Sequence, residues 1–186
     1  GCIDTQKVHI SSAIASGYKY MLIVTSDEAK ARKMCDDASF FNKEAIYYPA
    51  KDAIFYSADV HGNQITGERL RCISRIINHS STGEGVLTVV TTMDGIADRL
   101  IPVERFKEAV ITLDYSSEIE PEKLAKKLVA MGFVRTGMVE DKGQFAIRGG
   151  IIDIFSYTDE APVRIELWDT EVDSIRMFDV ESQRSI

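Results

Sequence analysis

The spacing of apolar and polar residues predicts alternating helices and strands over the first hundred residues. Short apolar runs, typical of the buried strands of a parallel sheet, occur at 20–25, 45–48 and 86–90. Segments with apolar residues at helical spacing occur at 6–16, at 65–78 and from 25 toward 41. Strands separated by helices of this size indicate βαβ units with right-handed crossovers.

A helix start is predicted where the first apolar run ends. The order Thr-Ser-Asp-Glu at 25–28 fits a capping box. The hydroxyl of Thr25 would then bind an exposed amide of the first turn, and Glu28 would reach back to the cap.

The pattern changes after Pro102. We expect a strand at 109–113 and a helix at 121–131, and strands dominate from Phe133 onward. The boundary therefore falls near 105–115. The sequence predicts an α/β domain over residues 1–108, a smaller α+β domain over 109–179, and at 180–186 the start of a segment returning to the first domain. The sheet of the first domain would then have an exposed apolar edge.

Composition indicates an ordinary globular protein. Of 186 residues, 45% are hydrophobic and 27% charged, and no apolar run reaches the roughly 18 residues of a membrane span. The first ten residues lack the basic and apolar regions of a signal peptide, so we expect a cytoplasmic protein. The formal net charge of −7 argues against a broad face for duplex DNA and favours a protein partner.

The cysteines do not form a metal-binding pattern. Cys2, Cys35 and Cys72 are scattered, with no CxxC spacing and no histidine at ligand-like spacing. We expect reduced thiols, no metal and no cofactor.

The first residues partly match a phosphate-binding loop. A Walker A loop needs a second glycine before its lysine and a hydroxyl residue after it. Here only Gly1 and Lys7 remain, because Gln6 replaces the glycine and Val8 replaces the hydroxyl residue. We therefore expect a parallel sheet of the P-loop type whose phosphate loop is degenerate. Lys7 would lie in that loop, exposed to solvent. Other catalytic motifs are absent, and His61 is predicted in a loop, so no catalytic residue is assigned.

The most informative stretch lies in the second half. GQFAIRGGIIDI (143–154) and PVRIELWD (162–169) set arginines at fixed points among strong strand formers. Arg135 and Arg148 flank a tight turn at 142–143, so paired strands would bring them together. Two interpretations remain open. The arginines form a protein recognition surface, or they make internal salt bridges to Asp153 or Glu166.

This stretch resembles a known family. A Gly-(Glu/Gln)-Phe-x-x-Arg-Gly segment, a Val-Arg-Ile-Glu strand and a Ser-Gln-Arg-Ser tail are similar to the UvrA-binding region shared by the excision-repair protein UvrB and the bacterial transcription-repair coupling factor. The likeness extends more loosely to 65–70 and 86–92. The lost Walker loop, and a segment at 53–62 too short for the damage-probing hairpin of UvrB, resemble the amino-terminal UvrB-like module of the coupling factor.

The resemblance implies a non-catalytic docking module that recruits UvrA in transcription-coupled nucleotide-excision repair. In the family, DNA translocation and contact with RNA polymerase belong to later domains. The positions that match the family's UvrA-binding residues are Arg135, Arg148, Phe155, Arg164 and Glu166. Glu166 is a candidate to orient the arginines. We expect Trp168 and Phe178 in the core, and Arg176 and Arg184 in domain contacts.

Two other functions stay as alternatives. The first is a UvrB-like nucleotide-dependent repair ATPase or helicase domain, against which Gln6 and Val8 argue. The second is a single-strand DNA-binding module, which would need a basic groove with exposed aromatic residues.

Overall fold

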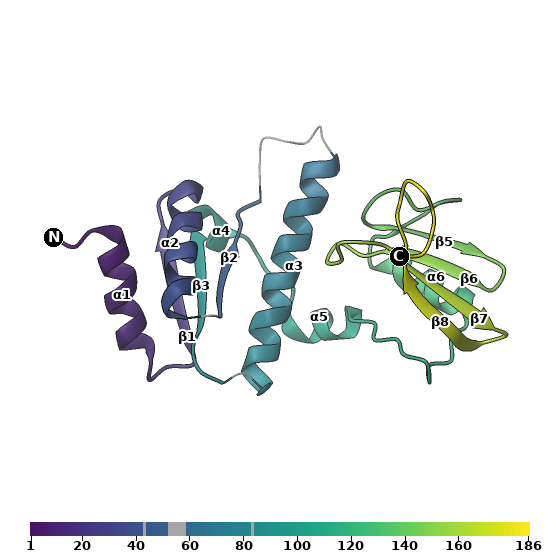
Figure 1. The fold of residues 1–186 in the computed structure, drawn as a ribbon, viewed down its shortest axis with the longest axis horizontal. Helices are drawn as coiled ribbons and strands as arrows, with labels where there is room; N and C mark the ends of the chain where they lie inside the picture. Colours follow the sequence, from purple (N-terminus) through teal and green to yellow (C-terminus); the bar gives the residue numbers. More distant parts are fainter. Residues whose placement is uncertain (43, 52–58, 83) are drawn as a thin grey trace. The chain divides into compact units, whose positions relative to one another are not determined.

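The chain folds into two compact units, 1–100 and 101–186 (Figure 1). The computed structural model describes residues 1–42, 44–51, 59–82 and 84–186. The first unit is α/β and the second is a smaller α+β unit, which confirms the predicted fold class. The finer domain limits at 108 and 179 stay a prediction.

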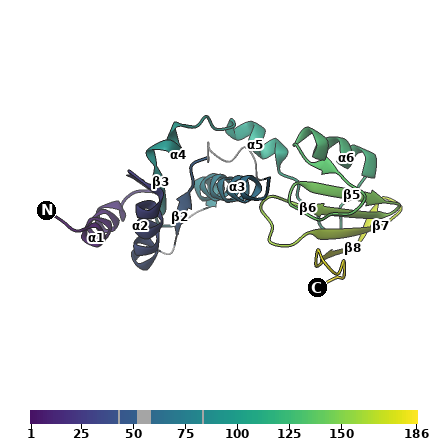
Figure 2. The ribbon, with the colours of Figure 1, turned by 90° about the horizontal axis from the view of Figure 1, so that it is seen from above.

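The first unit has a three-stranded parallel sheet between helices. Its elements are α1 (Asp4–Ala15), β1 (Tyr20–Thr25), α2 (Glu28–Phe41), β2 (Ala45–Tyr48), α3 (Asp59–Thr82), β3 (Leu87–Thr92) and α4 (Met93–Ala97). The strand order is β1-β3-β2, and both pairings are parallel. Helices α1 and α2 cover one face and α3 lies on the other (Figures 1 and 2). No described helix is both long and apolar enough to cross a membrane.

Strand β1 is an edge strand and not a fully buried one. It pairs only with β3 among the described residues, and Leu22 and Val24 on one of its faces are exposed. The central strand β3 is the buried strand of this sheet, with Leu87 and Val90 fully inaccessible. The expected exposed apolar edge therefore lies at β1.

The start of α2 is capped differently from the prediction. Asp27, not Thr25, is the N-cap residue, and its carboxylate accepts a 2.8 Å hydrogen bond from the amide of Lys30. The hydroxyl of Thr25 instead donates to the carbonyl of Asp27 at 2.9 Å. The predicted capping box is wrong because the helix begins only at Glu28, with Asp27 as its extended N-cap residue.

Helix α3 is longer than the predicted 65–78. It begins at Asp59, so His61 belongs to a helix and the predicted loop position is wrong. The prediction that 53–62 is too short for a long hairpin falls mostly outside the described residues.

The second unit contains two helices and a mixed five-stranded sheet. Its elements are α5 (Val103–Ala109), α6 (Pro121–Ala130), β4 (Val134–Arg135), β5 (Gln144–Arg148), β6 (Ile151–Phe155), β7 (Val163–Trp168) and β8 (Glu171–Met177). The strand order is sequential, with β4 parallel to β5 and the others antiparallel. The predicted strand at 109–113 does not form, since α5 continues to Ala109 and the next residues pair with no strand in the described chain.

The two faces of this sheet differ in chemistry. One face packs Phe145, Ile152 and Ile165 into the main core, against Leu124 and Leu128 of α6. Strand alternation puts Arg148, Asp153, Arg164, Glu166 and Arg176 on the other face. We call this second face the arginine face. One end of it is closed by a small cluster of Val139, Ala146, Phe155 and Phe178, beside Val180.

Candidate functional site

The register of β5 to β8 sets the side chains of the arginine face in rows. Arg148 lies opposite Ile151, which pairs with Glu166, which pairs with Ser174. The neighbouring row, toward the closed end, contains Ala146, Asp153, Arg164 and Arg176. The arginines and the buried aspartate therefore belong to adjacent rows of four paired strands.

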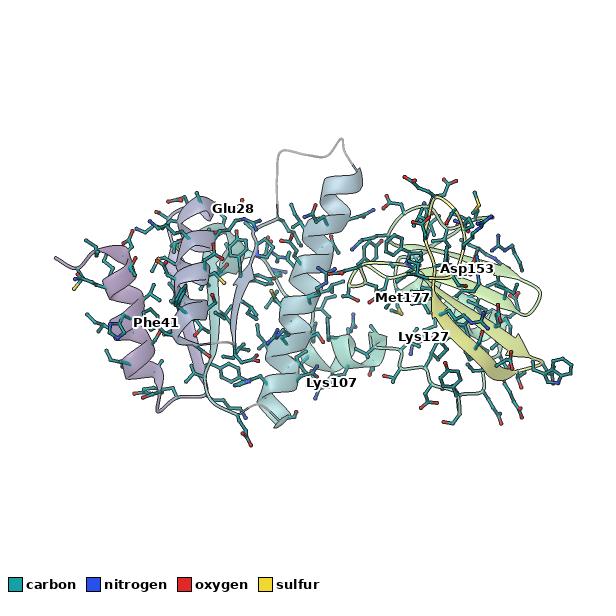
Figure 3. All side chains as sticks on the ribbon, viewed as in Figure 1. Glu28, Phe41, Lys107, Lys127, Asp153 and Met177 are labelled. Atoms are coloured by element: carbon teal, nitrogen blue, oxygen red, sulfur yellow. The ribbon has the colours of Figure 1, made fainter. Side chains whose placement is uncertain are left out.

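A buried carboxylate holds two of the arginines. Asp153 is fully inaccessible, at the centre of the sheet (Figure 3). Nη2 of Arg148 bonds to its Oδ2, and Arg164 makes a bidentate pair through Nε at 2.7 Å and Nη2 at 2.9 Å. The hydrogen bond from Arg164 to Asp153 raises the pKa of that guanidinium above its ordinary value. A buried charge is tolerated when it is paired in this way.

Arg148 is the accessible member of this triad. Its side chain is 45% exposed, against 17% for Arg164. Besides Asp153, it contacts the carbonyl of Gly137, 3.4 Å from Nη1. Both interpretations of the arginines therefore hold in part for Arg148: it is paired internally, and it is presented to solvent.

Arg164 makes its contacts within the second unit and is mostly buried. Its guanidinium lies 4.5 Å from the ring centre of Phe178, and Nη1 donates to the carbonyl of Gln183 at 3.2 Å. It thereby holds residues 178–183 over the closed end of the face.

Glu166 makes its direct contacts with β8. It accepts a 2.8 Å hydrogen bond from the hydroxyl of Ser174 and lies 3.6 Å from Arg176, and its charge also helps to raise the pKa of Arg164. The carboxylate that orients the two arginines is Asp153.

Phe155 is 8% exposed and packs in the cluster at the closed end. The structure thus does not present this ring to a partner. Phe155, which the resemblance matched to a UvrA-binding position, instead packs beneath the arginine face.

Arg135 lies on the other side of the sheet from Arg148. β4 runs parallel to β5 with Arg135 opposite Phe145, so both side chains point to the α6 side. There Arg135 lies 3.9 Å from Glu122. The expectation that paired strands bring Arg135 and Arg148 together is therefore wrong.

Trp168 is exposed, against the prediction from the sequence. It was expected in the core, yet 80% of it is exposed at the end of β7. The alternation Arg164, Glu166, Trp168 could have indicated this position, because all three point to the same face. Phe178, in contrast, is fully buried as predicted.

The degenerate phosphate loop opens α1. Lys7 pairs with Asp4 at 2.9 Å, and the side chain of Gln6 accepts from the amide of Ile3 at 3.3 Å. Val8 is fully buried in the core between α1 and α2. An apolar core residue thus occupies the position where a Walker loop has its magnesium-binding hydroxyl.

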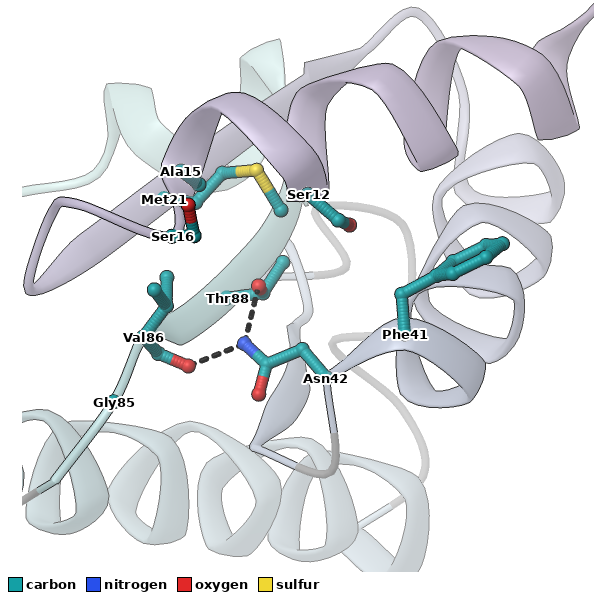
Figure 4. Close-up of a pocket in the computed structure, with 9 residues that line it drawn as sticks. All are labelled: Ser12, Ala15, Ser16, Met21, Phe41, Asn42, Gly85, Val86 and Thr88. Carbon is teal, nitrogen blue, oxygen red and sulfur yellow. Dashed lines mark hydrogen bonds between the residues drawn. The ribbon is translucent and has the colours of Figure 1, made fainter.

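A hollow of about 260 Å³ opens in the first unit, at the start of β3 (Figure 4). Asn42 donates to Thr88 at 2.9 Å and to the carbonyl of Val86 on its wall. No charged side chain lines the hollow, and the described residues contain no group of His, Cys, Asp or Glu able to hold a metal. It offers no chemistry that would define a catalytic site.

Residues 111–186 match the model of the UvrB interaction domain. The chain is 39% identical to the transcription-repair-coupling factor of Bacillus subtilis strain 168, over 98% of this chain and 15% of that protein. It is 36% identical to the factor of Staphylococcus aureus strain USA300 over 95% of this chain and 15% of that protein. It is 37% identical to the factor of Staphylococcus haemolyticus strain JCSC1435, over 90% of this chain and 14% of that protein.

The fold and the matched domain define a UvrB-like interaction module, with an α/β unit followed by a UvrB interaction domain. The relatives narrow this class. The chain is similar over nearly its whole length to part of the transcription-repair-coupling factors and spans about 15% of the length of the curated relatives it matches.

Proposed function

We propose that this chain is a non-catalytic docking module that recruits UvrA in transcription-coupled nucleotide-excision repair. The single observation that carries the proposal is Arg148, which a fully buried carboxylate fixes in place while 45% of its side chain stays exposed. A preorganised arginine loses little conformational freedom on binding and forms bidentate bonds to carboxylates. The description of the matched domain as an interaction domain supports a protein partner.

The charge distribution favours a protein over DNA. Residues 101–186 contain 17 acidic and 11 basic side chains, a formal difference of −6. Phosphate backbones are bound by clustered cations, whereas here the arginines lie within an acidic unit. We infer that the arginine face meets a local acidic patch on UvrA, with electrostatics setting the rate of encounter.

The other activities of the family are assigned to regions outside this chain. We propose that DNA translocation and contact with RNA polymerase reside there, that the whole protein acts in the cytoplasm, and that this module needs no cofactor. The buried Val8 and the pairing of Lys7 with Asp4 support a first unit that does not hydrolyse nucleotide.

Calorimetric titration of the chain with purified UvrA tests this proposal. Wild type should bind, and Arg148→Ala should lose about 2 kcal/mol or more if Arg148 is a hot spot. Arg105→Ala is the matched control, because Arg105 is an exposed arginine of the same unit on α5. Equal affinities for wild type and Arg148→Ala, with both folded, would remove Arg148 from the site.

A further inference from the structure

Trp168 extends the open end of the arginine face. It lies two residues beyond Glu166 on β7, with Leu167 between them turned into the main core. Glu166 lies one cross-strand pair from Ile151, which in turn lies opposite Arg148. The indole thus stands on the same face as Arg148, in the next row along the strands.

The backbone under Trp168 is fixed from two sides. It pairs with Glu171 across the β7–β8 hairpin, whose turn holds Asp169 at a φ of 59°. On one side the amide of Ile119 donates to the carbonyl of Thr170 at 2.7 Å. On the other, the amide of Leu167 donates to the carbonyl of Gly150 at 2.8 Å. An exposed aromatic ring on a fixed backbone loses little freedom on binding.

Two glycines without side chains form the turn that lies beside the end of β7. They are Gly149 and Gly150, between β5 and β6. A Cβ at Gly150 would meet the carbonyl oxygen of Leu167 at 2.9 Å, so the backbones are in close contact there. Above Gly149 there is open space, since a Cβ would meet nothing within 4 Å. The turn at 149–150 therefore adds no side chain beside the end of β7.

We propose that Trp168 is the aromatic anchor of the docking surface, with Arg148 as its charged anchor. The inference rests on the proposed function and names the chemistry of the partner surface. That surface on UvrA has a carboxylate for the guanidinium and, beside it, an apolar pocket for the indole. Trp168 is 80% exposed and belongs to none of the core clusters of the second unit, while tryptophan and arginine are the residues that most often dominate interface energetics.

The test uses the fact that Trp168 is the single tryptophan of the chain. The chain is labelled with 5-fluorotryptophan and titrated with unlabelled UvrA, and the ¹⁹F resonance is followed. We expect the resonance to shift and broaden on binding. In calorimetry, Trp168→Ala should weaken binding about tenfold or more at an unchanged melting temperature.

Two controls separate this inference from the proposed function. Phe40→Ala removes an aromatic side chain that is 92% exposed on α2 and should leave the affinity unchanged. If Arg148→Ala loses binding while Trp168→Ala retains it and the ¹⁹F resonance does not move, the anchor role is overturned and the docking function stands. If the folded wild type does not bind UvrA, both fail.

Discussion

The Nε atom of Arg164 lies 2.7 Å from Oδ1 of Asp153, a carboxylate with no exposed surface. The opposite oxygen of the same carboxylate bonds to Arg148, so one buried charge fixes two arginines with different tasks. Arg164 holds the end of the chain against the sheet, and Arg148 faces solvent. Under the proposed function, stability and recognition both depend on Asp153, and substitutions of the two arginines can separate them.

Arg164→Ala should destabilise the second unit more than it affects the exposed surface. The change leaves Asp153 buried with one partner instead of two and removes the contact with Phe178. We expect the free energy of unfolding to fall by about 3 kcal/mol, the lower end for a broken buried pair because Arg148 remains. Urea denaturation followed by circular dichroism measures it.

Arg176→Ala is the matched comparison for that experiment. Arg176 neighbours Arg164 in the cross-strand register, but its side chain is 54% exposed and lies 3.6 Å from Glu166. An exposed pair of this kind contributes less than about 1 kcal/mol. Equal losses for the two variants would show that burial of Asp153 does not govern stability.

Gly150→Ala should strain the turn beside the docking surface. Its Cβ would meet the carbonyl oxygen of Leu167 at 2.9 Å, and backbone cannot move aside as a flexible side chain can. We expect a loss of about 1–3 kcal/mol in the free energy of unfolding, as for other overpacked sites. Gly137→Ala serves as control, because its Cβ would meet nothing within 4 Å. The idea fails if both variants melt alike.

The N-cap of α2 predicts a dependence on pH. The backbone hydrogen bond from Lys30 lowers the pKa of Asp27 below its ordinary value of 3.8. A depressed folded-state pKa gives stability that is present above 3.8 and lost as the pH falls through the folded value. Asp27→Ala should therefore lower the melting temperature near neutral pH, and the difference from wild type should shrink in acid.

Asp27→Asn tests the same cap without the charge. Asparagine also accepts the amide hydrogen bond, so it should retain most of the stability near neutral pH and remove the acid dependence. Thermal melts of the three proteins across pH compare them directly. A constant difference between wild type and Asp27→Ala down to strongly acidic pH would contradict the assignment.

The cysteines should react in order of burial. Burial raises the pKa of the Cys72 thiol to about 12, while Cys2 is exposed. Because the thiolate is the reactive form, iodoacetamide near neutral pH should modify Cys2 first and Cys72 only after unfolding. Peptide mass spectrometry with and without denaturant reads this out. Comparable rates at Cys2 and Cys72 in the folded chain would show that Cys72, on α3, is not buried against β2.

The fold class and most helices could be predicted from the sequence, because apolar periodicity reports which face of an element is buried. The role of a strand within its sheet could not. The apolar run of β1 is similar to that of β3, yet β1 lies at the edge, since position depends on partners distant in sequence. The segment at 110–113 has strand-like composition but pairs with no strand in the described chain.

The arrangement of the candidate residues could be predicted only in part, for the same reason. Arg148 and Arg164 were predicted as docking residues and Asp153 as a possible salt-bridge partner, and the pairing of β5 to β7 brings the three together. Arg135 was expected beside Arg148 because a tight turn suggested an antiparallel hairpin. Instead β4 pairs in parallel with β5, and its register sets Arg135 opposite Phe145, on the face away from Arg148. Trp168 was assigned to the core from residue type, whereas its place two residues after Glu166 determines its exposure.

Hydrogen–deuterium exchange of the chain, free and saturated with UvrA, tests the central claim most directly, because it shows which surface the partner covers. We expect added protection at residues 146–152 and 164–168, the open part of the arginine face, and none in α1 or α2. Protection confined to residues 1–100, or a bound chain whose arginine face exchanges as it does alone, would contradict it.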